Sequence, residues 1–176
     1  MLKVLLVDDH KLIRVGLRQI IEANADFEVV GEAESGQDGL EKARDLKPDV
    51  VVMDINMPGM NGIEATRRIA RLDPRPRILI VSVLSRDPVP SRLLEAGADG
   101  YLSKDTAADE ILTALKMVKL GKRYLSADLA RQMALSQFDG DSPLDQLSDR
   151  EMEVLLMVTD GQSIQEIAEI LHVSPK

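Results

Sequence analysis

The sequence contains no cysteine and no tryptophan, and its aromatic residues are two tyrosines and two phenylalanines among 176 positions. The absence of cysteine excludes disulfide bonds, thiolate metal sites and cysteine nucleophiles, and it is compatible with a reducing cytosol. So few aromatic side chains argue against a stacking platform for single-stranded nucleic acid or a flavin. The sequence also lacks an apolar run of about 20 residues, the length that crosses a bilayer. We therefore expect a cytoplasmic protein without a membrane span.

Acidic residues outnumber basic ones by 30 to 22, and most of the excess lies near the C-terminus. Residues 140–176 carry eight acidic and two basic side chains, against 22 and 20 in residues 1–139. A strongly acidic segment is repelled by DNA phosphates. Phosphate contacts by residues 140–176 themselves are therefore not expected.

Short runs rich in Val, Ile and Leu recur at residues 3–7, 27–32, 50–53, 78–83 and 100–102. The stretches between them place apolar residues at helical spacing. Apolar strands that alternate with helices are typical of a parallel sheet buried on both faces. We therefore predict an α/β fold with a five-stranded, parallel, doubly wound sheet. The residues expected to face this sheet are Leu12, Val15, Ile20 and Ile21 in the first helix, Leu40, Ala43 and Leu46 in the second, Ile63, Ala65, Ile69 and Ala70 in the third, and Ile111, Leu112, Leu115 and Val118 in the fifth.

Residues 138–143 are small and polar, contain Gly and Pro, and predict a linker, after which the pattern is purely helical. Ser148 with Glu151 and Ser163 with Glu166 have the spacing of two capping boxes. Each opens an amphipathic helix, and such a pair alone is typical of many small helical hairpins. The residues expected to face inward are Val154, Leu155 and Val158 in the first helix, and Ile164, Ile167, Ala168 and Leu171 in the second.

Polar side chains follow the predicted strands where each one ends. Asp8 and Asp9 come after the first run, Asp54 follows the third, Ser82 closes the fourth and Lys104 follows the fifth. Ligands of doubly wound sheets bind at the carboxyl ends of the strands, so these side chains should meet. Two carboxylates about 4 Å apart repel by roughly 4 kcal/mol at an effective dielectric constant of 20, and three ionised together need a cation. Oxygen ligands favour Mg²⁺, which is the cofactor we expect.

Each of these residues also has an ordinary structural explanation. The aspartate pair could cap the first helix, Asp54 could belong to a turn, and Lys104 could be a solvated surface lysine. All of these explanations would have to hold independently at four strand ends, which favours a shared site. His10 and His172 have no partner recognisable in the sequence and are expected to be surface or helix-start residues.

The motifs at these strand ends are familiar. They are VDDH at residues 7–10, MDINMPGMNG at 53–62, Ser82, and GADGYLSK at 97–104. They resemble the phosphoacceptor receiver domain of two-component response regulators, over residues 1 to about 122. LSDRE at 147–151 and GQSIQEIA at 161–168 resemble the start of the LuxR-type helix-turn-helix output domain of the NarL/FixJ subfamily. Residues 87–98 and 123–137 are similar to the GacA/UvrY type of global regulator within that family.

The resemblance implies a flavodoxin-like receiver and roles for its acidic residues. Asp54 would be the nucleophile that takes a phosphoryl group from a sensor histidine kinase. Asp9, Asp54 and the backbone carbonyl of Asn56 would hold Mg²⁺, and Asp8 would act through a metal-bound water. The chain would then be a switch with at most slow self-dephosphorylation, and not an enzyme.

Three further residues would sense the phosphoryl group. Lys104 would neutralise its oxygens, Ser82 would hydrogen-bond the aspartyl phosphate, and Tyr101 would rotate inward as the switch aromatic. By the same resemblance, the change would alter the surface of the fourth and fifth helices and favour a homodimer.

The resemblance also implies a division of the chain. Residues 1–122 would be the receiver domain, 123–146 a helical linker, and 147–176 the first part of the DNA-binding domain. Ser174 followed by Pro175 reads as a third helix start, which would begin the recognition helix. Only Lys176 follows, so we expect DNA binding from the full-length protein but not specific DNA binding by this chain. Residues 147–176 would be held by the receiver, held by a second copy of the chain, or mobile.

Two other classes of function deserve comparison. A metal-dependent phosphohydrolase on a similar sheet is the main alternative, but such enzymes typically place Asp-x-Asp after the first strand. Here Asp8 and Asp9 are adjacent, and the best nucleophile, Asp54, follows the third strand. A nucleotide-binding module would need a phosphate-binding loop of the form G-x-x-x-x-G-K-[ST], which the sequence lacks.

Overall fold

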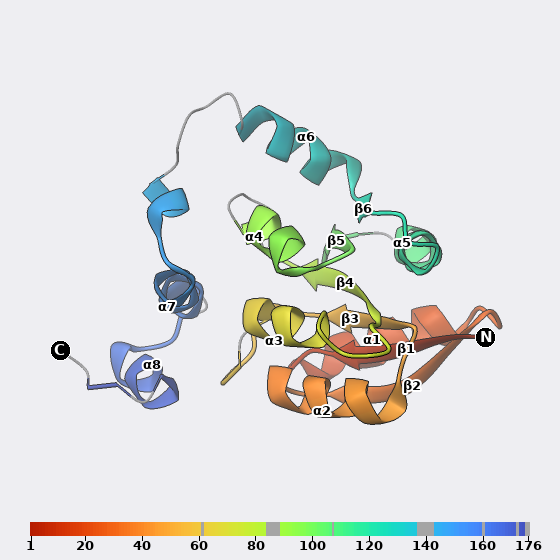
Figure 1. Cartoon of the computed structure of the whole chain (residues 1–176), viewed down its shortest axis with the longest axis horizontal. Coiled ribbons are helices and arrows are strands. Elements are labelled where there is room, and N and C mark those ends of the chain that lie inside the picture. The colour runs from red at the N-terminus through yellow and green to blue at the C-terminus, as the bar shows by residue number, and fades with distance from the viewer. Residues whose placement is uncertain are drawn as a thin grey trace.

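The computed structural model describes residues 1–60, 62–83, 89–106, 108–136, 143–159, 161–171 and 173–174. One parallel sheet has the strand order β2-β1-β3-β4-β5-β6 (Figure 1). Its strands are β1 (Leu2–Val7), β2 (Phe27–Ala33), β3 (Val50–Met53), β4 (Arg77–Ser82), β5 (Gly100–Ser103) and β6 (Tyr124–Leu125). The predicted parallel α/β fold is confirmed.

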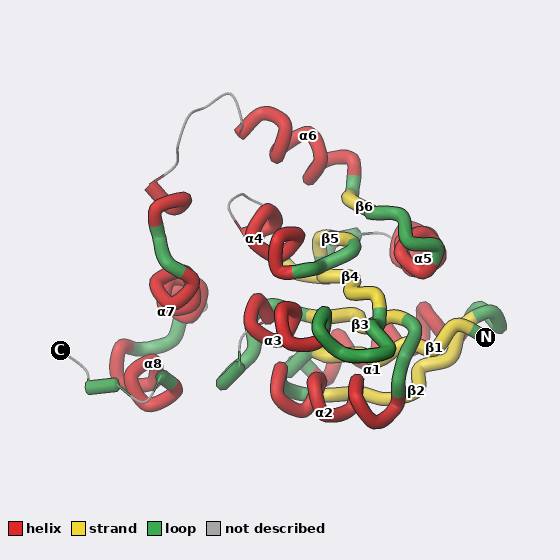
Figure 2. Tube along the Cα trace, in the orientation of Figure 1, coloured by secondary structure: helices red, strands yellow, loops and turns green. Residues whose placement is uncertain are grey.

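Helices cover both faces of the sheet (Figure 2). One face carries α1 (Lys11–Glu22) and α5 (Ala108–Lys119), and the other carries α2 (Gly36–Leu46), α3 (Gly62–Ile69) and α4 (Val89–Ala96). Successive side chains of a strand point to opposite faces. In β1, Val4 and Leu6 therefore pack with α1 and α5, whereas Leu5 and Val7 pack with α2 and α3. Within the described ranges, no helix is long and apolar enough to cross a membrane.

The sheet has one strand more than the five predicted. β6 pairs in parallel with β5, where Tyr124 lies opposite Gly100 and Leu125 opposite Tyr101. A two-residue strand is too short to give a recognisable pattern in the sequence. α6 (Ala127–Ser136) follows directly, and most of the predicted linker at 138–143 lies outside the described residues.

The inward face of α1 was predicted wrongly in its first half. Leu12 and Val15, which were expected to face the sheet, are 86% and 43% exposed. The buried positions are Arg14, Leu17 and Ile21, which also follow helical spacing. Hydrophobic spacing alone could not select this face, because the residue that begins the buried stripe is an arginine. The second helix shows a smaller difference, since Leu46 at its end is exposed.

The two capped helices of the C-terminal segment are present as α7 (Asp149–Thr159) and α8 (Ile164–Ile170), preceded by the 3-10 helix η1 (Pro143–Gln146). Both capping boxes form. In the first, the Ser148 backbone N–H donates to the Glu151 carboxylate and the Glu151 N–H donates to the Ser148 hydroxyl, and the second box pairs Ser163 with Glu166 in the same way. The predicted inward faces are partly wrong, because Val158 and Ile164 are exposed. His172, Pro175 and Lys176 lie outside the described residues.

α7 packs against the sheet-containing part of the chain. Met152 and Leu156 are buried in the same apolar cluster as Ile63 of α3 and Leu93 of α4. The guanidinium of Arg92 on α4 also donates to the backbone carbonyls of Leu144 and Leu147, just before α7 begins. Of the alternatives considered for residues 147–176, the structure shows α7 held by the preceding domain.

We predict that Leu156→Ala releases α7 from this contact. Removing a buried leucine side chain costs about 2–5 kcal/mol, and each 1.4 kcal/mol is a tenfold change in an equilibrium. Amide hydrogen exchange in α7 should therefore become at least tenfold faster. Val158→Ala removes an exposed side chain from the same helix and should change exchange little. Equal effects of the two substitutions would contradict this packing.

Candidate functional site

Two buried aspartates lie at the ends of adjacent strands. The backbone N–H of Asp54 donates to the Val7 carbonyl at 2.8 Å, and the Asp8 N–H donates to the Ala33 carbonyl at 3.1 Å. Each residue thus continues the hydrogen bonding of its strand by one position, and both are about 3% exposed. The parallel arrangement of β1 and β3 therefore brings both carboxylates to one edge of the sheet.

Lys104 lies between these two carboxylates. Its Nζ is 2.8 Å from Asp8 Oδ2 and 2.7 Å from Asp54 Oδ2. Its backbone N–H donates to the Ser82 carbonyl at 2.9 Å, which fixes the residue at the end of β5. The lysine predicted from the fifth strand therefore does reach the aspartates of the first and third.

The pKa values of the pair reflect burial and mutual contact. Burial raises the pKa of Asp54, and Lys104 only partly opposes that effect while the charge of Asp8 adds to it. Burial lowers the pKa of Lys104, but the hydrogen bond and charge of Asp54, then those of Asp8, outweigh it and leave the pKa raised. The ammonium group therefore keeps its proton in the site.

Asp9 and His10 complete an acidic cluster with the two buried aspartates. Asp8, Asp9, His10 and Asp54 can each offer one ligand atom within 4.8 Å of the others. Asp9 Oδ1 is buried and accepts no hydrogen bond from the described residues. His10 Nδ1 lies 2.8 Å from it, but not in hydrogen-bonding geometry, and 3.2 Å from Asp8 Oδ1. An orphaned carboxylate oxygen among oxygen donors fits a hard divalent cation such as Mg²⁺.

His10 is the exposed N-cap residue of α1, as expected for a surface or helix-start residue, but it does have partners. Its backbone N–H donates to Asp8 Oδ1 at 2.7 Å, and its ring lies beside both aspartates of the turn. The sequence could have placed His10 near the site, because it directly follows the aspartate pair. The sequence could not show that its ring turns toward the carboxylates.

The loop after Asp54 connects the acidic cluster with the C-terminal segment. Ile55, Asn56 and Met57 line a small cavity whose other walls are residues of α7 and Gln162. Asn56 Oδ1 and Gln162 Oε1 are both buried in this region without a hydrogen-bond partner among the described residues. The predicted metal-ligand position at Asn56 therefore lies two residues from Asp54 and in contact with α7.

Ser82 and Tyr101 lie on the neighbouring strands β4 and β5 and are both fully buried. Burial raises the pKa of the Tyr101 phenol, a side-chain hydrogen bond with Ser82 opposes this, and the charge of Asp54 adds to it. The Tyr101 ring lies in the apolar core of the sheet in this structure. Its rotation in response to phosphorylation stays a prediction.

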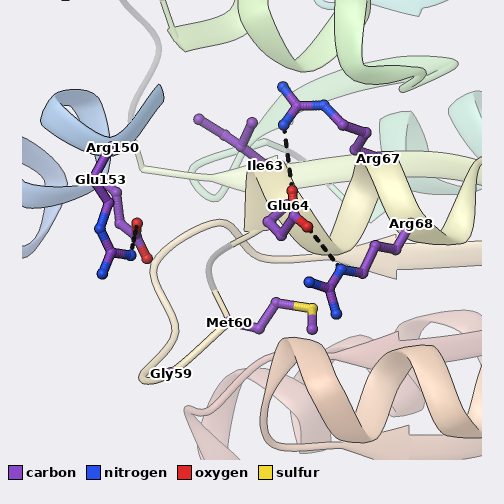
Figure 3. Close-up of a pocket in the computed structure, with 8 residues that line it drawn as sticks. All are labelled: Gly59, Met60, Ile63, Glu64, Arg67, Arg68, Arg150 and Glu153. Carbon is purple, nitrogen blue, oxygen red and sulfur yellow. Dashed lines mark hydrogen bonds and ion pairs between the residues drawn. The ribbon is translucent and has the colours of Figure 1, made fainter. Parts of the chain in front are cut away.

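A separate and larger pocket of about 400 Å³ lies between α3 and α7 (Figure 3). Its arginines pair with glutamates of their own helices. Glu64 is 3.3 Å from Arg67 and 2.7 Å from Arg68, and Arg150 is 2.6 Å from Glu153. The charges that line this pocket are already paired with one another. The acidic cluster, in contrast, gathers several carboxylates around one lysine, so it is the better candidate for binding a cation.

Comparison with known proteins agrees with the motifs. Residues 4–116 match the response regulator receiver domain, and residues 145–176 match the luxR family of bacterial regulatory proteins. The response regulator UvrY of Escherichia coli (strain K12) is 46% identical over 179 aligned positions, which cover all of this chain and 82% of UvrY. These matches give no support to the alternative of a metal-dependent phosphohydrolase.

Solved structures show the same architecture. A LuxR-family two-component response regulator from Aurantimonas sp. SI85-9A1 is 37% identical with a TM-score of 0.74, over 77% of this chain and 97% of that one. The RcsB response regulator of Salmonella typhimurium, described for its conformational dynamism in DNA interaction, is 27% identical with a TM-score of 0.72. That match covers 98% of this chain and 84% of RcsB.

The crowding of carboxylates predicts an effect of Asp9→Asn. Among the described residues, the ion pairs of Lys104 are with Asp8 and Asp54 and not with Asp9, so neutralising Asp9 should relieve repulsion. We expect the metal-free melting temperature to rise by about 2–4 °C, the shift produced by about 1 kcal/mol at this chain length. Stabilisation by added Mg²⁺ should be lost at the same time.

The control for this prediction is Asp45→Asn, which removes an exposed charge on α2. It should leave both the metal-free melting temperature and the Mg²⁺ response nearly unchanged. A metal-free Asp9→Asn protein that melts clearly below the unmodified chain would show that repulsion at the cluster is not a cost to the fold.

Proposed function

The chain belongs to the two-component response regulators, and from that premise we propose that Asp54 is its phosphoacceptor. The observation that carries the proposal is the meeting of Asp8, Asp9, Asp54 and Lys104 at one edge of the sheet. The proposed donor is a phosphohistidine of a sensor histidine kinase. Phosphoryl transfer would convert the receiver from its unphosphorylated to its phosphorylated state. That change would regulate transcription through the LuxR-type output segment.

The proposed transfer begins with attack of an Asp54 carboxylate oxygen on the phosphorus atom. The new O–P bond forms while the P–N bond to the donor histidine breaks, and the histidine nitrogen keeps the electron pair and takes up a proton. Lys104 touches Asp54 Oδ2 and keeps its own proton, so its ammonium is placed to pair with incoming phosphoryl oxygens. Phosphoryl transfer depends mainly on such positioning and charge stabilisation.

Asp8, Asp9, Asp54 and the backbone carbonyl of Asn56 are the residues we propose for Mg²⁺. When bound, the ion supplies positive charge to the oxygens of the transferred group. The buried Oδ1 of Asp9 accepts no hydrogen bond from the described residues, and this supports the assignment because a buried carboxylate oxygen is costly unless a hydrogen-bond donor or a cation meets it. By the resemblance to receiver domains, we propose that Asp8 acts through a metal-bound water.

We further propose that Ser82 and Tyr101 read the state of Asp54. Ser82 would exchange its hydrogen bond with Tyr101 for one to the phosphoryl group, since one hydroxyl hydrogen serves one acceptor at a time. Movement at β4 and β5 would then alter the adjoining surface of α4 and α5. A switch needs two states that differ in affinity for the phosphoryl group, and this exchange supplies the difference.

The proposed division of the chain is a receiver at 1–122, a helical linker at 123–146 and a helix-turn-helix segment at 147–176. Matches at residues 4–116 and 145–176 support the two outer parts. DNA is the proposed partner of the output, a homodimer is the proposed active assembly, and a DNA partner implies a cytoplasmic protein. The phosphorylated state would decay by slow self-dephosphorylation.

Acetyl phosphate with Mg²⁺ should add one phosphoryl group to the chain, as read by intact-protein mass spectrometry. Asp54→Asn should abolish the addition because the nucleophilic oxygen is lost. Asp105→Asn, which alters an exposed acid beside Lys104, should be labelled like the unmodified chain. Labelling that survives Asp54→Asn would refute the assignment, and many turnovers of a phosphate ester would favour an enzyme.

Beryllofluoride, which mimics the phosphoryl group, should shift the chain toward a dimer measurable by light scattering. The shift should disappear in Ser82→Ala, because the hydroxyl that reports the state of Asp54 is removed. Leu135→Ala alters an exposed side chain on α6 and should leave the shift intact. An unchanged mass with beryllofluoride in the unmodified chain would rule out this mode of activation.

A further inference from the structure

We propose that Arg14 is a positioning residue for the aspartate turn of the phosphoacceptor site. This inference rests on the proposed function and adds a residue to it that does not touch the reacting atoms. Arg14 lies on α1 and is 4% exposed, although an arginine is rarely buried unless it is paired. Its place at the start of the inward stripe of α1, where a hydrophobic residue would ordinarily lie, calls for a specific use.

The guanidinium of Arg14 joins three segments of the chain. Nη1 donates to the backbone carbonyl of Asp8 at 2.6 Å. Nε donates to Glu32 of β2 at 3.1 Å, and Nη2 donates to Glu34 just after that strand. A planar guanidinium offers these donors in a fixed fork, so the three contacts together define its orientation. Arg14 therefore ties the turn after β1 to the end of β2.

The contact with Asp8 acts on both aspartates of the turn. The carbonyl that receives the hydrogen bond belongs to the peptide unit between Asp8 and Asp9, which is planar. Restraining the carbonyl restrains the orientation of that plane, which contains the Cα atoms of both aspartates. The turn is also restrained by the His10 N–H on Asp8 Oδ1, by the Arg14 N–H on the His10 carbonyl and by the Asp8 N–H on the Ala33 carbonyl. The guanidinium of Arg14 is what restrains the Asp8 carbonyl.

Charge does not explain this arginine. A cation near an acidic metal site disfavours metal binding, so by electrostatics alone its removal would strengthen Mg²⁺ binding. Glu32 and Glu34 pair with Arg14 and balance its positive charge. The contribution of Arg14 to the site is therefore its hydrogen bond to the Asp8 carbonyl and not its charge. Positioning therefore predicts weaker metal binding on removal of Arg14, and electrostatics predicts the opposite sign.

Arg18 provides a matched control one helical turn later. It pairs with the same Glu32 at 2.7 Å and with Glu22 at 2.7 Å, and its side chain is more exposed than that of Arg14. Its contacts in the described residues do not include the Asp8 carbonyl. Arg18→Met thus removes a positive charge and a Glu32 pair from α1 without touching the aspartate turn.

The test compares Mn²⁺ affinity, measured by electron paramagnetic resonance titration with Mg²⁺ competition, in the full chain and its variants. Arg14→Met should weaken binding about tenfold, and Arg18→Met should stay within about twofold of the unmodified chain. Arg14→Lys keeps the charge but loses the fork, so it should also bind more weakly. Circular dichroism and melting of the metal-free proteins identify variants that have lost the fold. If Arg14→Met does not fold, Arg14→Lys carries the comparison.

The outcomes separate this inference from the proposed function. Folded Arg14 variants that bind Mn²⁺ as well as the unmodified chain, or more tightly, overturn the positioning role while labelling at Asp54 stands. Equal weakening by Arg18→Met also overturns it, since the loss would then follow from charge or from α1 in general. An unmodified chain that neither binds Mn²⁺ nor accepts a phosphoryl group refutes the proposed function itself.

Discussion

Asp8 and Asp54 lie buried side by side at the ends of β1 and β3, with the ammonium group of Lys104 between them at 2.8 and 2.7 Å. A buried carboxylate is costly unless a cation or donors compensate it, and one lysine compensates one of the two charges. Asp9 adds a third carboxylate, whose buried Oδ1 accepts no hydrogen bond within the described part of the chain. The excess negative charge is what suits the site to a divalent cation.

The same edge of the sheet is in physical contact with the C-terminal segment. Residues 55–57 follow Asp54 directly and share a small cavity with α7 and Gln162. α7 is held there by buried apolar side chains and by the hydrogen bonds of Arg92 to the residues just before it. The loop after Asp54 and α7 therefore form one packed unit.

The sequence determined the parallel α/β fold, because five apolar runs buried on both faces admit few other arrangements. It also determined that the aspartates and Lys104 lie close together, because residues at the carboxyl ends of parallel strands share one edge of the sheet. The capping boxes of α7 and α8 were readable for a similar reason, since each depends on residues three positions apart. In all three cases the physical cause is local or follows from topology alone.

Tertiary structure decided what depends on partners distant in the chain. The two-residue β6 exists because β5 offers it an edge, and the buried face of α1 is set by Arg14, whose partners Glu32 and Glu34 come from β2 and the residue beyond it. Val158 and Ile164 fit a helical stripe as well as the residues that are buried in their place. Hydrophobic periodicity specifies that a helix has an inner face, but the surface it meets decides which residues form it, and that surface is assembled only in the folded chain.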